Sequence, residues 1–334
     1  MGKIVFFTLY IVYITFFSAC SQEVTIRSLE PARIDRISTT KKIIVRKFTN
    51  DKVGLSSKIE SLLASFTIDG KKYFTIVSRR DFDKIIEEQK LQYSGIVDMD
   101  TVVEVGELVG AEAIVSGDVD RVSSSLTRYY KTKTKCADKK CEKTIKYKVG
   151  CVKKIVKLSA YVRISDITKG DIIVSDTLSG SKSYSHCYDD SRAMPSTSMV
   201  AREIADSMAR KFTYKLTPHY RNFTVTLLDT PDLDYTDKQE ELLEVALEYI
   251  EQKRYAKAQK LLKRLVDSTD SQSYVPVYNL GVISEVKGKY KEAKEYYSYA
   301  DDLMIQPVDE INSAVFRIDR LIKKHDITIK QISR

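Results

Sequence analysis

Five cysteines are the residues whose surroundings say most about the chemistry of this chain. The first, Cys20, follows one early lysine, Lys3, an apolar run over residues 4–17, and the small pair Ser18 and Ala19. The run is shorter than the roughly 20 apolar residues that span a bilayer, and it is typical of a secretory signal peptide. Cleavage before Cys20 would leave a terminal thiol and amine that can carry acyl chains. The sequence therefore predicts a signal peptide over residues 1–19 and lipidation of Cys20.

Residues 17–20 resemble the bacterial lipobox, with Phe17 standing where the pattern prefers Leu. An uncleaved anchor helix and a plain secretory signal are the alternatives to a lipoprotein. Ser21 follows the cysteine, in place of the Asp that would act as an inner-membrane retention signal. We therefore expect a lipid-anchored protein at the outer membrane, facing the periplasm.

The other four cysteines are Cys136, Cys141, Cys151 and Cys187. An exported chain meets an oxidising compartment, so this even number predicts two disulfides. The segment between Cys136 and Cys141 looks like a hairpin tip, and their pairing would leave Cys151 for Cys187. Four cysteines allow three connectivities, so this pairing is a preference. A zinc site that includes His186 is the alternative, but the spacing lacks the close cysteine pairs usual in structural zinc sites.

Motifs of known enzyme classes are not found in the sequence. The three histidines, His186, His219 and His325, lie far apart without a fitting acid or nucleophile motif around them. Residues 179–182 match the S-x-x-K of acyl-transfer serine enzymes by letter, but the partner motifs of that class are missing. No phosphate loop, HExxH or glycine-rich fingerprint occurs. We therefore expect a non-enzymatic protein with no metal and no cofactor.

Composition indicates folded material with a basic surface. The length of 334 residues suggests two folded units, and a hydrophobic fraction of 43% is too high for a disordered chain. The net charge is +9, and the Lys and Arg are spread along the chain with a moderate excess between Arg128 and Lys157. Nucleic-acid binders more often gather these residues on one helix or tail, so we expect no nucleic-acid partner. The balance is compatible with attraction to anionic lipid or polymer.

Hydrophobic periodicity divides the chain after residue 40. A polar tether is expected over residues 20–40 and an α/β domain over residues 41–228. Within that domain the pattern predicts strands at 42–48, 73–77, 111–119, 155–164 and 171–178, and helices at 55–66, 81–90, 98–108 and 196–212. A turn is expected at 166–170.

Three segments in this region resemble the CsgG family, named for the curli secretion channel: residues 78–91, residues 111–117 and the turn at 166–170. The resemblance extends over roughly residues 41–214. The positions that carry the motif are Arg80, Asp81, Glu88, Gln89, Gly110 and Gly117. It implies a periplasmic α/β domain with a mixed sheet, held near the outer membrane by an N-terminal lipid. An activator lipoprotein of penicillin-binding proteins resembles the same family, so the fold alone does not choose the function.

Channel members of that family are expected to insert two β-hairpins per subunit into the membrane. The first candidate here, an insert at residues 122–157, has Lys131, Lys133 and Lys135 on one face. Its opposite face carries Arg128, with few apolar residues such as Leu126 and Tyr130 to meet lipid. The second candidate, residues 177–198, is short and rich in Ser, Asp and Lys. Since a lipid-facing Arg or Lys at mid-bilayer costs about 2–4 kcal/mol, we expect a soluble hairpin pinned by a disulfide.

Residues 236–325 are predicted to form an all-α domain of tetratricopeptide-like repeats with a capping helix at 308–324. The second copy of the pattern is the clearer one, and in the first copy Lys253 replaces the turn glycine. Such repeats present a surface for peptides or partner helices, and the alternative is a helical spacer without a ligand. The residues assigned to partner binding are Tyr249, Tyr255, Ala258, Tyr278, Asn279, Leu280, Gly281, Tyr290, Ala293 and Tyr297.

The leading hypothesis is an outer-membrane lipoprotein that acts as a scaffold or accessory in envelope assembly or in secretion of surface material. Its partners would be envelope proteins bound through the helical repeats and the membrane bound through the lipid. The first alternative is a subunit of an oligomeric curli-type secretion channel, and a homo-oligomeric ring is compatible with both readings. The second alternative is an activator of cell-wall synthases.

Overall fold

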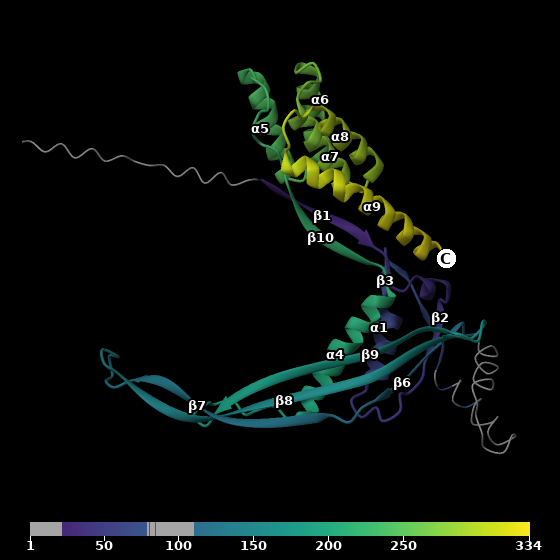
Figure 1. The fold of residues 1–334 in the computed structure, drawn as a ribbon, viewed down its shortest axis with the longest axis vertical. Helices are drawn as coiled ribbons and strands as arrows, with labels where there is room; N and C mark the ends of the chain where they lie inside the picture. Colours follow the sequence, from purple (N-terminus) through teal and green to yellow (C-terminus); the bar gives the residue numbers. More distant parts are fainter. Residues whose placement is uncertain (1–21, 79, 81–83, 85–109) are drawn as a thin grey trace, which may run out of the picture. The chain divides into compact units, whose positions relative to one another are not determined.

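The computed structural model describes residues 22–78, 80, 84 and 110–334. They form two compact units, drawn in Figure 1. The α/β unit holds residues 29–220 and 324–334, and the helical unit holds residues 22–28 and 221–323. The helices expected at 81–90 and 98–108, the signal peptide and Cys20 lie outside the described residues. The predicted fold class, a mixed-sheet α/β domain followed by a run of helices, is confirmed.

The α/β unit is built on one mixed sheet. Its strands follow the order β5–β2–β6–β8–β7, and β9 pairs with the other edge of β8. The β2 strand lies parallel to β5 and β6, whereas β8 lies antiparallel to β6, β7 and β9. The bounds are β2 (Lys42–Val45), β5 (Thr75–Ile76), β6 (Ala113–Val119), β7 (Ser123–Cys136), β8 (Thr144–Asp166) and β9 (Ile172–Cys187).

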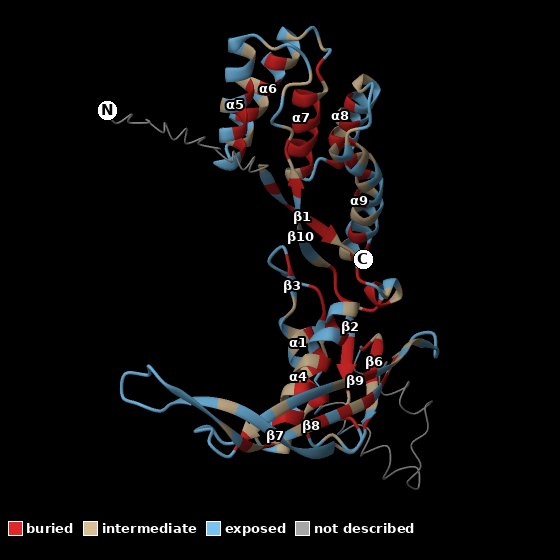
Figure 2. Cartoon of the chain, turned by 60° about the vertical axis from the view of Figure 1, so that its left-hand side comes forward, coloured by how far each residue is buried: buried red, intermediate tan, exposed pale blue. Residues whose placement is uncertain are grey.

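Two helices, α1 (Leu55–Ser65) and α4 (Thr197–Leu216), cover one face of this sheet (Figure 2). Alternate residues of a strand point to opposite faces, and the even-numbered residues of β8 point to the helices. Ile204 and Met208 of α4 pack so closely on Gly180 of β9 that an added Cβ there would lie 2.6 Å from Ile204. The even-numbered apolar residues of β8 that are buried in this core are Val156, Leu158, Ala160, Val162 and Ile164.

The strands at the centre of the sheet are longer than the sequence pattern predicts. Residues 144–166 form the single strand β8, which joins the return of the predicted hairpin to the strand expected at 155–164. Residues 172–187 form β9, and a loop leads from its end to α4, so the second candidate hairpin does not form as a pair of strands. The hairpin insert itself is present as β7 and the first part of β8.

Residues 20–40 were expected to be a tether, but the described part of this range is ordered. Strand β1 (Glu23–Glu30) pairs with β10 (His219–Thr226), which the periodicity did not predict, and a 3-10 helix, η1 (Asp35–Thr39), follows. The side chain of Gln331 is fully buried and exchanges two hydrogen bonds with the backbone of Ala32. A short hairpin of β3 (Thr67–Ile68) and β4 (Lys71–Lys72) completes the α/β unit.

The helical unit contains two helical hairpins and one long helix. Its helices are α5 (Asp237–Glu251), α6 (Tyr255–Ser268), α7 (Tyr274–Val286), α8 (Tyr290–Leu303) and α9 (Asp309–Ser333), the last of which extends beyond residue 323 into the α/β unit. Thr236 and Gln239 form a capping box at the start of α5. Among the described residues, no helix is both long and apolar enough to cross a membrane.

The two hairpins have equivalent turns that are filled by different residues. Gly288 lies between α7 and α8 with a φ of +72°, and Lys253 lies between α5 and α6 with a φ of +58°. The left-handed region is open to glycine, whereas a side chain there costs roughly 1–2 kcal/mol. Lys253 therefore holds a strained conformation at the position where the second hairpin has glycine.

Replacing this lysine should relieve that strain. We expect Lys253→Gly to raise the free energy of unfolding of the helical unit by about 0.5–1 kcal/mol, because the strain relieved exceeds the added freedom of the unfolded chain. Urea denaturation followed by circular dichroism measures the change. Gly288→Lys is the matched control and should lower the same free energy. A loss of stability in Lys253→Gly would contradict this account of the turn.

Candidate interaction surfaces

The part of the sheet formed by β7, residues 144–157 of β8 and residues 181–190 is called the arm here. Both disulfides lie in it, and their pairing is the one that the sequence favours. Cys136 and Cys141 close the hairpin tip, with Cα atoms 4.7 Å apart. Cys151 and Cys187 face each other on β8 and β9, and they are buried together with Val149. One bridge thus closes the tip of the β7–β8 hairpin, and the other joins the end of β9 to β8.

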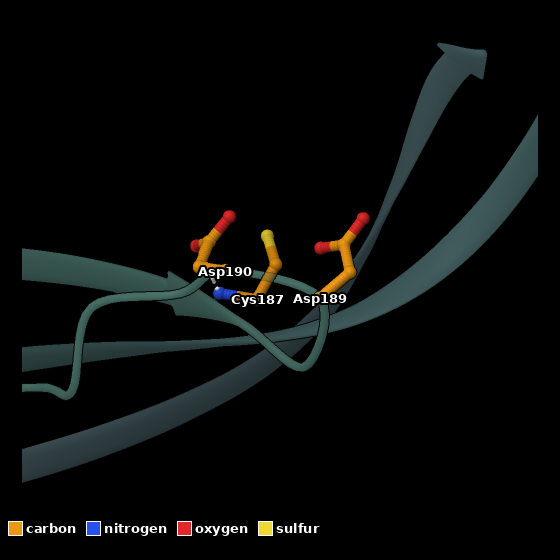
Figure 3. A group of neighbouring side chains, drawn as sticks. All are labelled: Cys187, Asp189 and Asp190. Carbon is orange, nitrogen blue, oxygen red and sulfur yellow. Dashed lines mark hydrogen bonds between the residues drawn. The ribbon is translucent and has the colours of Figure 1, made fainter. Parts of the chain in front are cut away.

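A cluster of charges fixes the loop that follows β9. Lys133 donates hydrogen bonds to the carboxylates of Asp189, at 2.7 Å, and Asp190, at 2.9 Å. Tyr147 donates to Asp189. The backbone N–H of Cys187 donates to Asp190 (Figure 3). The bonds from Lys133 and Tyr147 lower the pKa of the Asp189 carboxyl. This loop is therefore held against the odd-numbered face of the arm by charge-assisted hydrogen bonds.

Cys187, Asp189 and Asp190 bring possible ligand atoms within 4.8 Å of one another, which is the spacing of a metal site. Figure 3 shows the sulfur of Cys187 lying between the two carboxylates. That sulfur is bonded to Cys151, so it cannot act as a thiolate ligand. Lys133 occupies both carboxylates. The cluster is accounted for by internal bonds, and the zinc alternative has no thiolate left among these four cysteines.

Both faces of the arm carry cations. The odd-numbered face has Lys131, Lys133 and Lys135 of β7, as the sequence predicts. It also carries Tyr147 and Lys153 of β8, which pair with Lys133 and Thr127. The even-numbered face includes Arg128, and it also holds the two apolar side chains expected there, Leu126 at 65% exposure and Tyr130 at 81%. The arm therefore presents two solvated, basic faces joined by one hydrogen-bonded ribbon.

The residues assigned to partner binding in the repeats are mostly buried between helices. Tyr297 lies against Gly281, where an added Cβ would meet its ring at 2.6 Å. Asn279 binds the backbone of Leu228 with both its amide oxygen and its amide nitrogen. Of the assigned residues, only Tyr249 and Tyr255 are not buried, each being partly exposed. The pattern thus describes how the helices pack, and partner contact through these residues stays a prediction.

A buried polar cluster in the helical unit was not predicted from the sequence. Glu285 is fully buried and accepts hydrogen bonds from Arg317, at 2.9 and 3.0 Å, and from Tyr297, at 2.5 Å. Burial and the nearby Glu285 carboxylate raise the pKa of Tyr297 well above its usual value, so the phenol stays a donor. A glutamate inside the apolar α7 was the available signal, since a buried charge needs a partner. This cluster joins α7, α8 and α9.

The residues of the family motif are only partly described. Gly117 lies in β6, where an added Cβ would lie 2.6 Å from the carbonyl oxygen of Tyr161, so the strands could not keep this distance with a side chain. Gly110 has a φ of +67° at the turn before β6, and Arg80 is exposed. Asp81, Glu88 and Gln89 lie outside the described residues.

Residues 36–129 match the sequence model of the family described as "Curli production assembly/transport component CsgG". This segment is similar to the CsgG family. The resemblance drawn from residues 78–91 and 111–117 is thereby confirmed. The matched segment runs from η1 into β7, so it includes the parallel part of the sheet and the start of the arm.

A comparison with curated proteins gives no match. Among solved structures, the chain is similar to the PelC dodecamer from Paraburkholderia phytofirmans at 13% identity, with 56% of this chain and 94% of that chain covered and a TM-score of 0.19. The similarity to the CsgG family therefore rests on the sequence match of residues 36–129.

The two disulfides should differ in their effect on stability. The Cys151–Cys187 bridge closes a sequence separation of 36 residues and the tip bridge one of 5. Loop-closure entropy then predicts that Cys151→Ala with Cys187→Ala lowers the free energy of unfolding by about 4 kcal/mol, and Cys136→Ala with Cys141→Ala by about 2 kcal/mol. Urea denaturation of both variants checks the order, and thiol titration of the mature chain should find none of these four thiols free. Free thiols together with bound zinc would contradict the assignment.

Proposed function

We propose that this protein is a non-enzymatic accessory lipoprotein in outer-membrane assembly or secretion of surface material. The observation that carries the proposal is the match of residues 36–129 to the CsgG family, whose description names curli assembly and transport. The signal-like run before Cys20 supports lipid anchoring with the chain facing the periplasm. The helical hairpins that follow the α/β unit support a role in binding other proteins.

Three features of the arm support an accessory role over a channel. Cations occupy both of its faces, and a lipid-facing strand would have to bury one of those sets in hydrocarbon. The segment after β9 binds back to the arm through Lys133 in place of forming a second hairpin. The disulfide tip is also charged, since Lys139 and Lys140 are exposed there. We therefore propose that the arm lies in water and does not enter the membrane, which favours the accessory hypothesis.

Partner binding is assigned to the exposed side of α9 in the helical unit. Phe316 is 75% exposed there, although its neighbours in sequence, Val315 and Arg317, pack inward. An isolated exposed aromatic on a helix is a suitable anchor for a protein partner, because aromatic residues supply much of the energy of protein interfaces. Envelope proteins are the partners that the predicted location offers.

Anchoring is tested by Cys20→Ala. We expect this variant to be released from membranes during fractionation of cells, because one cysteine carries all of the predicted lipid and stable anchoring needs more than one acyl chain. The chain with Cys136→Ala and Cys141→Ala is the matched control and should stay with the membrane. If Cys20→Ala remains tightly attached, the lipoprotein assignment fails.

Partner binding is tested by Phe316→Asp in the full chain. Crosslinking followed by capture from the native envelope should recover fewer partner proteins, by about tenfold, if Phe316 is an interface anchor worth about 1–2 kcal/mol. Ile305→Asp is the matched control, because Ile305 is also apolar and is 98% exposed. Equal recovery in both variants would remove Phe316 from the interface. Stable single-channel conductance of the purified protein in planar bilayers would favour the channel alternative.

A further inference from the structure

One edge strand of the arm carries a regular row of hydroxyl groups. Six successive odd-numbered residues of β9 are Ser or Thr, and all six are exposed. Alternation places them on one face of the sheet, opposite the face that packs on α4. They are Ser175, Thr177, Ser179, Ser181, Ser183 and Ser185. A fold needs no such repetition on a solvent face, where polar residues of many kinds are tolerated.

The register extends this hydroxyl row across the sheet. Ser179 pairs with Ser159 of β8, and β7 adds Ser123, Ser125 and Thr127 on the same face. No helix among the described residues covers this face, as Figure 2 shows for α1 and α4 on the other side. A depression of about 550 Å³ lies in it. Its lining residues are Arg121, Ser123, Lys157, Leu158, Ser159, Ser179, Gly180 and Ser181.

Cations border the hydroxyl row. Lys153 and Lys157 of β8 face the same side as the serines and are exposed, and Lys131 of β7 continues the series toward the tip. Within the described part of the chain, no carboxylate pairs with these three lysines, whereas Lys133 is held by two aspartates. Three ammonium groups are thus directed at solvent along one open face.

The net charge of the protein is concentrated in the hairpin. Residues 122–157 contain twelve Lys and Arg and two Asp and Glu, a net charge of +10, while the whole chain has +9. The remainder of the protein is therefore close to neutral. Same-sign charges on one ribbon repel each other and cost stability, and a polyanion would relieve that repulsion.

We infer that the odd-numbered face of β7, β8 and β9 binds a carboxylated polysaccharide. Ammonium groups pair with carboxylates, and rows of hydroxyls can exchange hydrogen bonds with sugar hydroxyls, since each Ser or Thr both donates and accepts. A lipid surface fits less well, because the exposed apolar side chains of this face, Tyr129, Ile145 and Tyr161, lie far apart along it and form no continuous patch to enter the acyl boundary. The inference deepens the proposed function, on which it rests, by naming the class of surface material that the accessory protein handles.

The test uses the purified mature chain carrying Cys20→Ala, with polygalacturonate as the probe and dextran as the neutral control. At about 150 mM salt, we expect measurable binding to polygalacturonate and none to dextran, with affinity falling as salt is raised. Lys153→Gln with Lys157→Gln should weaken binding about tenfold, since each exposed ion pair contributes up to about 1 kcal/mol. Ser179→Ala, Ser181→Ala and Ser183→Ala together should also weaken it, by about threefold, with the charge unchanged.

The matched control removes the same charge from the opposite face of the same strand. Lys146→Gln with Lys148→Gln should change the affinity less than about twofold. Equal weakening by the two lysine pairs would overturn the inference in favour of attraction to any polyanion. Absence of polygalacturonate binding, or equal binding to phosphatidylglycerol vesicles, would overturn it as well. These binding results are independent of the membrane release of Cys20→Ala and of partner capture by Phe316→Asp. The proposed function and this inference can therefore fail separately.

Discussion

The alternation of side chains along β8 is the constraint on which the α/β unit depends. This strand has 23 residues and contacts three others, so its two faces run through most of the sheet. Its even-numbered side chains, from Val156 to Ile164, bury against α1 and α4, and burial of each Val, Leu or Ile among them contributes about 1.5–3 kcal/mol. Because the period is two, this choice also sends every odd-numbered side chain to the open face. The same alternation of β8 side chains therefore determines both the core and the candidate binding face.

The parts of this fold that sequence could predict are those with a local signal. The helix at α1, the strand at β6 and the pairing of the cysteines each depend on a short period or a short spacing. The sequence pattern predicts a break in β8 because the adjacent Lys153 and Lys154 interrupt the alternation. In the structure the strand continues through these residues, because it pairs there with β7 on one edge and β9 on the other. The sequence predicts a tether where strand β1 forms, because its partner, β10, lies some 190 residues away in the chain. A local pattern of residues does not predict pairing over such a separation.

The candidate sites show the same limit. The repeat pattern led to Tyr278, Gly281 and Tyr297, because small and aromatic residues at fixed spacing are what close helix packing needs. The same packing buries them, so the pattern locates the scaffold and not its exposed anchor. Glu285 could be suspected from one charge in an apolar helix, but its partner Arg317 lies in a different helix. The sequence does not predict that Phe316 is exposed, because the apolar pattern of α9 is compatible with Phe316 on the buried or on the exposed face.

The strand register explains how a hairpin with a net charge of +10 stays paired. Like charges directly opposite each other destabilise a sheet, and the observed pairing sets Lys131 against Val149, Lys133 against Tyr147 and Thr132 against Lys148. A slip of one residue in one direction would set Lys131 against Lys148 and would also turn every side chain of one strand to the other face. The tip disulfide between Cys136 and Cys141 fixes the turn and opposes that slip, and the bridge between Cys151 and Cys187 fixes the pairing of β8 with β9. The charges can therefore gather on one ribbon because its covalent and hydrogen-bonded register keeps them apart, and the same register holds the hydroxyl row in line beside them.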